Sequence, residues 1–357
     1  MDRGLSRMRR SPTTLTSLAA GLAMVLCAAC GGSTAPVGAG STGNAGGAGT
    51  TNPPANAGSL ALFAGNPVDG GIVDGAGEAA RFVGPAALAI DAGGNLYVTA
   101  TCAIRKLTAA GVASLFAGSY SNCGSLDGSA FPSASAIAAA PDGRLFIVSG
   151  RNVIEVGPAG ATRTLAVLEP GNLGGGIAVD GAGNLIVATS IGTRRIAPSG
   201  VSTMLEGVAG ADGGSGTYAM ARRGVAADAA GNVYLAALDN TIVRIDNAGN
   251  RSVLAGTPNT SGTADGSGAV ARFGKVVALA LDSLGNLYAA DAGADGQLIR
   301  KITAFGVVST VAGKPGVAAL QPGALPGGLA PLGGLAFDGK GSLYASSGNA
   351  IARIALP

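Results

Sequence analysis

One phrase of eleven residues recurs six times along this chain. Each copy has an apolar strand pattern that ends in Asp, a short turn with Gly-Asn or a similar pair, and a second apolar strand pattern. The copies begin 40 to 56 residues apart. Repeats of this length cannot bury an apolar face alone and must stack side by side. The copies are Leu88–Val98, Ile137–Ile147 (with Ala140 in place of Asp), Ile177–Val187, Val225–Leu235, Leu279–Ala289 and Leu335–Ala345.

Two further strand patterns follow the phrase in the repeats before the last, as Ala103–Gly111 and Val112–Gly118 show in the first repeat. Gly, Asn and Asp at the turns, with β-branched residues between them, predict about four short strands per repeat. No segment has a sustained 3.6-residue apolar period with caps, so we expect little helix. Six four-stranded antiparallel units predict an all-β fold, a six-bladed β-propeller.

The ends of the repeat region predict how the ring closes. Ser59–Gly65 matches the last strand of a repeat, whereas the sixth repeat ends at Ile351–Pro357 with its third strand. We expect the N-terminal strand to complete the last blade, which would also cover two exposed sheet edges. A small residue stands four positions before each turn Asp, as inner strands that converge on an axis require. These residues are Ala87, Ala136, Gly176, Gly224, Ala278 and Gly334.

The first and fifth repeats resemble the NHL repeat. The resemblance rests on Gly77–Gly118 and Gly268–Gly313, which contain an Ala-Arg-Phe triplet at Ala80–Phe82 and Ala271–Phe273. It covers Ser59–Pro357 but is weaker in the second, third and sixth repeats. It implies a propeller whose inter-blade loops and second-to-third-strand loops share one face and bind partners there. The fold hosts both binders and enzymes, so the resemblance selects no single function.

Residues 1–29 are predicted to be an export signal. Four Arg precede an apolar stretch over 15–26, which is too short to span a bilayer. The segment 26–31 (LCAACG) resembles the lipobox of bacterial lipoproteins, with Cys30 as the lipidated residue, although Cys27 stands where Leu is usual. The alternative is an ordinary signal peptide cut after a small residue.

Residues 30–58 are predicted to be a flexible linker. The segment 31–58 has no charge and a single large apolar residue, Val37, so it cannot bury a core. A linker of this length spans roughly 30 Å on average. The formal net charge of +3 falls to 0 without residues 1–29, so the remaining chain lacks the basic footprint of a nucleic-acid binder. We predict a monomeric domain over 59–357, lipid-anchored in the bacterial cell envelope and either periplasmic or surface-exposed.

The long inter-blade loops contain two groups of charged residues. Their Asp-Gly pairs fit either a repeated Asx-type turn or a ring of calcium ligands, and the lack of a calcium-loop spacing favours the turn. These pairs begin at Asp74, Asp127, Asp212 and Asp265. Five cations are expected near the channel mouth as a candidate rim for an anionic polymer or a carboxylate. They are Arg81, Arg222, Arg223, Arg272 and Lys275. Alternatively, the Arg of each Ala-Arg-Phe triplet pairs with a loop Asp.

Cys102 and Cys123 are the two cysteines of the predicted folded domain. By the repeat alignment they lie in adjacent loops on one face, and an exported domain is in an oxidising compartment. We therefore predict a disulfide between them, in preference to a metal–thiolate site.

Basic residues alternate with Ile and Leu in the third strands. We interpret them as the polar face of half-buried strands rather than as a functional basic patch. They are Arg105, Lys106, Arg194, Arg195, Arg244, Arg300, Lys301 and Arg353.

The chain contains no histidine, which excludes His-ligated zinc sites and Ser-His-Asp hydrolysis. A lactonase-like site would need a Glu with several Asn or Asp in the channel, and no Glu aligns with an inner strand. We therefore predict a non-catalytic binding or scaffold module for an envelope protein or polysaccharide, with no cofactor. The alternative is a metal-dependent propeller hydrolase or lyase. A sensor partner in a signalling assembly would have the same sequence features as the binding module.

Overall fold

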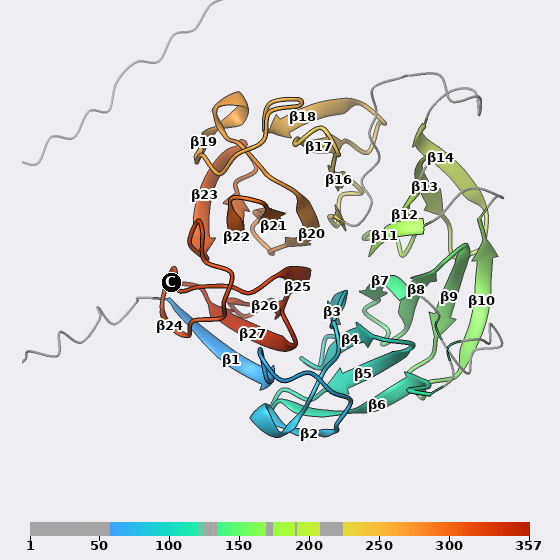
Figure 1. Ribbon diagram of the computed structural model, residues 1–357. Coiled ribbons are helices and arrows are strands. Elements are labelled where there is room, and N and C mark those ends of the chain that lie inside the picture. The colour runs from blue at the N-terminus through green and yellow to red at the C-terminus, as the bar shows by residue number, and fades with distance from the viewer. Residues whose placement is uncertain are drawn as a thin grey trace, which may run out of the picture. The chain divides into compact units, whose positions relative to one another are not determined.

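The computed structural model describes residues 58–121, 123, 131, 134–168, 174–189, 191–207 and 224–357. Their strands form six antiparallel sheets arranged in a ring (Figure 1), which confirms the predicted six-bladed β-propeller. Helix in these residues is limited to the 3-10 turns η1 (Gly77–Ala79) and η2 (Gly268–Val270). In the part of the chain that is described, no helix has the length and apolar character needed to cross a bilayer.

Blades 1 to 5 each contain four consecutive strands, which follow one another from the ring centre outward. Blade 1 contains β3 (Leu88–Ile90), β4 (Leu96–Ala100), β5 (Ala103–Leu107) and β6 (Val112–Gly118). Blade 2 contains β7 (Ala134–Ala139), β8 (Leu145–Ser149), β9 (Asn152–Val156) and β10 (Thr162–Val167). Blade 3 contains β11 (Gly174–Val179), β12 (Leu185–Thr189), β13 (Gly192–Ile196) and β14 (Ser202–Gly207). Blade 4 contains β15 (Val225–Ala227), β16 (Val233–Ala236), β17 (Ile242–Ile245) and β18 (Arg251–Ala255). Blade 5 contains β20 (Val276–Leu281), β21 (Leu287–Gly293), β22 (Gly296–Ile302) and β23 (Val307–Ala312).

Blade 6 is built from both ends of the propeller. It contains β25 (Leu332–Phe337), β26 (Ser342–Ser347), β27 (Ala350–Ala355) and β1 (Ser59–Gly65). Strand β1 pairs antiparallel with β27, with Ser59 opposite Ala355 and Gly65 opposite Ala350. Figure 1 shows the blue β1 beside the red β27. The predicted closure of the ring by the N-terminal strand is confirmed.

Three blades carry a fifth, two-residue strand that the repeats did not predict. Strand β2 (Gly75–Ala76) pairs with β6, β19 (Gly266–Ser267) pairs with β23, and β24 (Gly323–Ala324) pairs with β1. Each belongs to the loop that enters its blade. The chain therefore covers the outer edge of a blade before it turns inward to form the innermost strand, and this protects the edge.

The Asp of the repeated phrase holds the first hairpin of the blade. In blade 1, Asp91 accepts hydrogen bonds from the Asn95 backbone N–H at 2.8 Å, the Asn95 side-chain amide at 2.8 Å and the Tyr97 hydroxyl at 3.1 Å. Burial and the neighbouring Asp91 carboxylate raise the pKa of Tyr97 to about 12, so its hydroxyl stays a donor. Asp282 makes the corresponding bonds in blade 5. The Asp, Asn and Tyr of the phrase therefore stabilise a hairpin, and this structural role is sufficient to explain why they recur.

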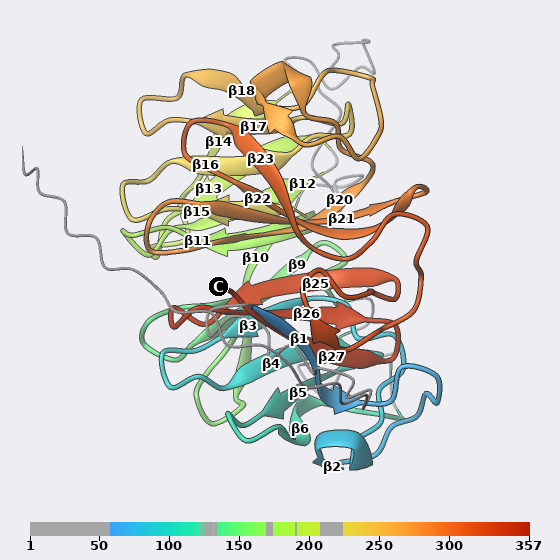
Figure 2. The same ribbon diagram turned by 90° about the vertical axis from the view of Figure 1, so that its left-hand side faces the viewer.

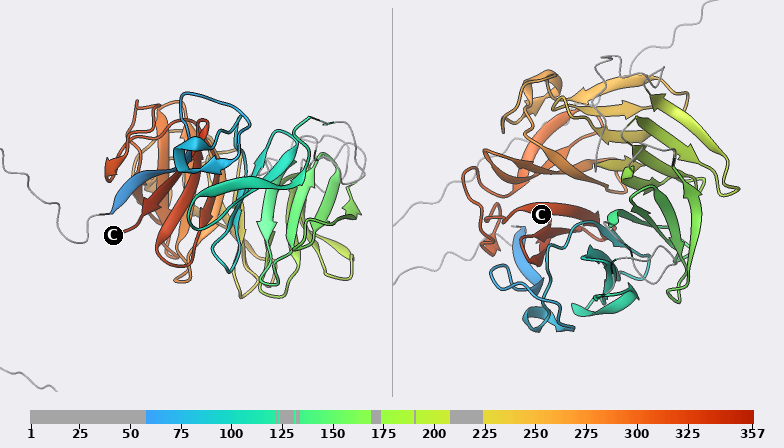
Figure 3. Two further views of the ribbon diagram at one scale, coloured as in Figure 1. Left: turned by 90° about the horizontal axis from the view of Figure 1, so that it is seen from below. Right: turned by 45° about the vertical axis from the view of Figure 1, so that its right-hand side comes forward.

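The ring has two faces with different loops (Figure 2). We call one face the top face; it carries the inter-blade loops and the loops between second and third strands. The opposite face, the bottom face, carries the tight turns between first and second strands and between third and fourth strands. Gly58 lies at the bottom face because the next residue, Ser59, pairs with Ala355 at the end of β27. Figure 3 shows the blades side by side from two further directions.

The six inner strands surround a narrow channel. Part of it is a cavity of about 50 Å³, and its lining side chains, among the described residues, are small or aliphatic apart from the hydroxyl residue Ser135. The close approach of the strands explains the predicted small residues. A Cβ added to Gly334 would lie 2.5 Å from the carbonyl oxygen of Ala86 in the neighbouring blade. A Cβ added to Gly224 would lie 2.8 Å from Cβ of Ala236.

Candidate ligand-binding site on the top face

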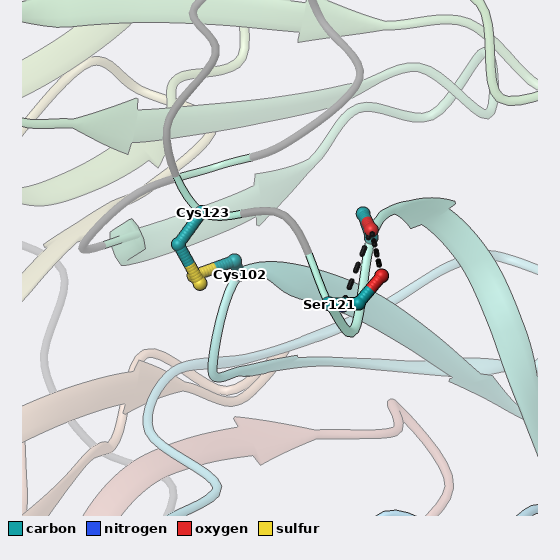
Figure 4. The surroundings of a disulfide bond; sticks show 4 residues. Cys102, Ser121 and Cys123 are labelled. Atoms are coloured by element: carbon teal, nitrogen blue, oxygen red, sulfur yellow. Dashed lines mark hydrogen bonds between the residues drawn. A yellow bond between two sulfur atoms is a disulfide. The ribbon is translucent and has the colours of Figure 1, made fainter.

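The predicted disulfide is present. Cys102, in the turn between β4 and β5, is bonded to Cys123 in the loop that leaves β6, with a Cα–Cα distance of 5.3 Å (Figure 4). Next to this bond, the Ser121 backbone N–H donates to the Ser119 hydroxyl at 3.2 Å. The disulfide thus ties an inter-blade loop to a loop on the same face of blade 1.

Arg105 corrects one of the sequence interpretations. We expected it on the polar face of a half-buried strand, but it is only 1% exposed. Its guanidinium pairs with Asp74 at 2.6 Å, donates to the carbonyl of Val73 at 2.7 Å and lies 4.4 Å from the ring centroid of Phe82. The loop that covers the outer edge of blade 1 supplies these partners, and a repeat alignment does not show that the loop folds back there.

Blade 5 repeats this arrangement with Arg300, which is fully buried. Its guanidinium pairs with Asp265 at 2.7 Å and with Asp291 at 3.3 Å, and lies 5.4 Å from the ring centroid of Phe273. Asp74 and Asp265 are therefore structural partners of buried arginines, which neither the turn nor the calcium interpretation anticipated. Asp127 and Asp212 lie outside the described residues.

Arg81 and Arg272 lie at the outer edges of blades 1 and 5, not near the channel mouth where we expected them. Their loops run outward because β2 and β19 pair with the outermost strands of these blades. The Arg81 guanidinium donates to the carbonyl of Glu78 in η1 and to that of Ala80 just after it, and pairs with the exposed Asp69 at 3.2 Å. Arg272 donates to three consecutive carbonyls of η2 and its flank, those of Ala269, Val270 and Ala271. The predicted alternative, an Arg–Asp pair in the first triplet, is present.

Lys275 is the member of the predicted rim that the structure places beside the inner strands. It is exposed and immediately precedes β20. It lines a pocket of about 480 Å³ together with Leu238 and Asn240 from the second-to-third-strand loop of blade 4. Among the described residues, Lys275 has no ion pair. Arg222 and Arg223, the other two cations of the rim, lie outside the described residues.

The backbone beside Lys275 is held from both sides. The side-chain amide of Asn240 donates to the Gly274 carbonyl at 2.5 Å, and the Gly274 N–H donates to the Asp291 carboxylate at 2.9 Å. Asn240 adopts a left-handed backbone conformation, with a φ of 67°. A Cβ on Gly274 would lie 2.6 Å from Cα of Gly293, so only glycine fits there. The pocket is thus a fixed cradle with one positive charge and apolar walls, which suits an anionic group attached to an apolar body.

Asp291 makes the stability of this cradle depend on pH. Burial raises the pKa of Asp291 to about 6, against the hydrogen bond from Gly274 and the charge of Arg300, which lower it. Because this pKa is higher in the folded than in the unfolded chain, protonation of Asp291 stabilises the folded state. This contribution is complete below the unfolded-state pKa and is lost as the pH rises through about 6. We expect the free energy of unfolding to fall by about 2 kcal/mol more in the wild type than in Asp291→Asn between pH 4 and pH 7.5.

Urea unfolding followed by circular dichroism at the two pH values measures this difference. Asp69→Asn is the control, because it makes the same substitution at a carboxylate that is 69% exposed. Equal pH dependence in the wild type and Asp291→Asn would show that Asp291 is not the group responsible.

Asn240 and Asp291 are the residues of the site that the sequence interpretation missed. At the position of Asp291 the other blades have small residues or hydroxyl residues, namely Ala100, Ser149, Thr189, Ala237 and Ser347. The carboxylate at this position was the available signal. Of the four Glu, Glu78, Glu155 and Glu206 lie in η1, β9 and β14, as expected away from the inner strands, and Glu169 is outside the described residues. Across the described ranges, no three Cys, Asp or Glu form a group that could hold a metal ion.

No protein-family model matches this chain, and no curated protein sequence matches it. Solved structures do match. A protein of unknown function from Bacteroides thetaiotaomicron is 19% identical with a TM-score of 0.68, over 84% of this chain and 76% of that one. An auxiliary nutrient binding protein from Bacteroides ovatus is 15% identical with a TM-score of 0.66, over 84% and 77%. A gluconolactonase from Xanthomonas campestris is 12% identical with a TM-score of 0.54, over 76% and 86%. At these identities the likeness is one of fold.

Proposed function

We propose that this chain is an exported, lipid-anchored propeller of the NHL-repeat type that acts as a non-catalytic binding module. Residues 1–29 are the proposed lipoprotein signal, Cys30 is the lipidated residue, residues 30–58 are the linker and 59–357 are the propeller. The support is the Arg-rich, apolar N-terminus with its lipobox-like segment, together with structural neighbours named for nutrient binding. The proposed location is the bacterial cell envelope, periplasmic or surface-exposed, and the proposed form is a monomer.

The observation that carries the binding role is the pocket beside Lys275. A rigid backbone, apolar walls and an exposed ammonium that has no ion pair in the described structure are concentrated in one place on the top face. The linker attaches at Gly58 on the opposite face, so the pocket points away from the anchored end of the domain. We propose that the pocket receives a carboxylate-bearing part of an envelope protein or polysaccharide.

Charge reversal at Lys275 tests this function. In intact cells, cross-linking followed by identification of the captured molecules should recover a partner with the wild type. Lys275→Glu should lower that recovery about tenfold or more, because the anionic group then meets a like charge. Lys314→Glu is the matched control, since Lys314 is an exposed lysine just after β23 of the same blade and does not line the pocket. Equal recovery with all three proteins would contradict the proposed site.

A metal-dependent hydrolase or lyase is the second candidate, and the shared fold with a gluconolactonase is the observation that favours it. Such an enzyme needs a divalent ion held by carboxylates or amides, whereas the narrow part of the channel is lined by small and aliphatic residues. We expect elemental analysis of the purified protein to find no stoichiometric divalent ion. One ion per chain, together with turnover of a lactone, would replace the binding proposal.

A further inference from the structure

Two exposed apolar side chains lie in the two bottom-face turns of blade 5. Leu284, in the turn between β20 and β21, is 84% exposed, and Phe305, in the turn between β22 and β23, is 92% exposed. Neither side chain is needed to form its turn. Gly285 and Gly306 follow them with φ values of 79° and 78° and provide the left-handed position that each turn requires.

The other blades show what these turns normally contain. At the position of Leu284 they have small or charged residues, namely Gly93, Asp142, Ala182, Ala230 and Lys340. At the position of Phe305 they have Ala110, Ala159, Ser199 and Ala248. Blade 5 therefore departs from the repeat twice, on the same face, toward side chains that are exposed and unfavourable in water. The fold gives no reason for either departure.

The position of these turns points to what covers them. A groove of about 700 Å³ on the bottom face is lined by Leu284, by Lys301 and Ser309 from the strands that flank Phe305, and by Gly58. Within it, the rings of Tyr288 and Phe337 stack at a centroid distance of 6.0 Å. The exposed apolar turns thus lie on the same face as Gly58, the first described residue of the propeller and the one that follows the proposed linker in the sequence.

The charged residues around the groove do not favour an anionic partner for this face. The groove lining contains one lysine, Lys301, and one carboxylate, Asp282. The neighbouring turn of blade 6 adds Asp338 and Lys340, so the two turns together have equal numbers of positive and negative charges. A covering surface must therefore be reached through apolar contact. A bilayer of neutral phospholipid meets this requirement, because burying apolar side chains in its interface needs no charge on the lipid.

We propose that Leu284 and Phe305 insert into the interface of the membrane that anchors the chain, so that the bottom face rests on the bilayer and the pocket of Lys275 faces outward. This inference rests on the lipid anchor of the proposed function. Without the insertion, a linker of this length would leave the propeller free to turn within roughly 30 Å of the surface.

The chain has no tryptophan, so one introduced tryptophan is a clean reporter. We would purify Phe305→Trp from the membrane fraction and reconstitute it in phosphatidylcholine vesicles that contain nitroxide-labelled lipid. Val68→Trp is the matched control, because Val68 is 90% exposed in the loop after β1, on the top face. We expect the emission of the tryptophan at position 305 to shift to shorter wavelength and to be quenched, and the emission at position 68 to do neither. Adding Leu284→Ser to Phe305→Trp should lower vesicle-dependent quenching.

Absence of quenching at position 305, or equal quenching at both positions, would overturn the proposal. Quenching that appears only when half of the lipid is phosphatidylglycerol would also overturn it, because attraction by charge would then replace apolar insertion. A failure of the lipid anchor is distinguished at the first step, since the protein would then be recovered in the soluble fraction. Ligand binding is tested separately, by the cross-linking comparison of the wild type with Lys275→Glu, because Lys275 lies on the opposite face.

Discussion

Replacing Asp74 by alanine is expected to lower the free energy of unfolding by about 3 kcal/mol, because it leaves the charge of Arg105 buried without its carboxylate. Arg105 is 1% exposed, whereas Asp74 is 45% exposed. The Asp74 carboxylate also accepts from the Leu115 N–H at 3.2 Å and the Tyr120 hydroxyl at 3.1 Å, so the substitution releases the loop from blade 1 as well. Urea unfolding followed by circular dichroism measures the change.

Two variants show whether burial is the cause. Asp69→Ala removes the exposed pair with Arg81, which should change the free energy of unfolding by less than about 1 kcal/mol. Arg105→Met combined with Asp74→Ala removes both charges and should recover part of the loss. If Asp69→Ala and Asp74→Ala are equally mild, the buried arginine does not depend on its carboxylate, and the loop is held mainly by its backbone hydrogen bonds.

Removing strand β1 is expected to abolish cooperative folding. A chain that begins at Asn66 lacks the burial of Leu60 and Ala64, and leaves the edge of β27 unpaired. Loss of a buried leucine side chain alone lowers stability by about 2–5 kcal/mol, which is a large part of the roughly 5–15 kcal/mol typical of a domain. The exposed edge should in addition promote association between chains. Thermal unfolding and size-exclusion chromatography measure both effects.

The control for this truncation is a chain that begins at Gly58, which keeps β1 and should unfold in one cooperative transition. A synthetic peptide of residues 58–66 added to the shorter chain should restore part of the transition, because it can pair with β27 as an added strand. If the chain that begins at Asn66 unfolds at the same temperature as the chain that begins at Gly58, closure by β1 contributes little to stability.

The architecture was largely predictable because short sequence patterns that repeat along the chain determine it. The turn Asp with its Asn and Tyr, the glycines at the turns and the small residues on the inner strands each act within one hairpin or between neighbouring blades. The unmatched strand Ser59–Gly65 and the incomplete sixth repeat predicted the closure for the same reason. The disulfide between Cys102 and Cys123 was predictable once the loops were assigned to faces.

The charged residues were less predictable because their environments depend on where long loops turn. Arg105 and Lys106 are neighbours in one strand, yet Arg105 is buried and Lys106 only partly, since the loop with Asp74 folds back over one of them. For the same reason Arg81 and Arg272 lie at the outer edges of their blades, while Lys275, three residues after Arg272, lines the top-face pocket.

The sequence by itself thus determined the number of blades, the strand that closes them and the cysteine pair. Hairpin turns and repeat periods are local features of the sequence, so they can be predicted without knowing which distant segments are in contact. Only the tertiary structure decided which cations are buried, which are exposed at a pocket, and which apolar turns stand beside the start of the propeller. The free energy of a charged or apolar side chain depends on the solvent left around it, and that is set by segments far away along the chain.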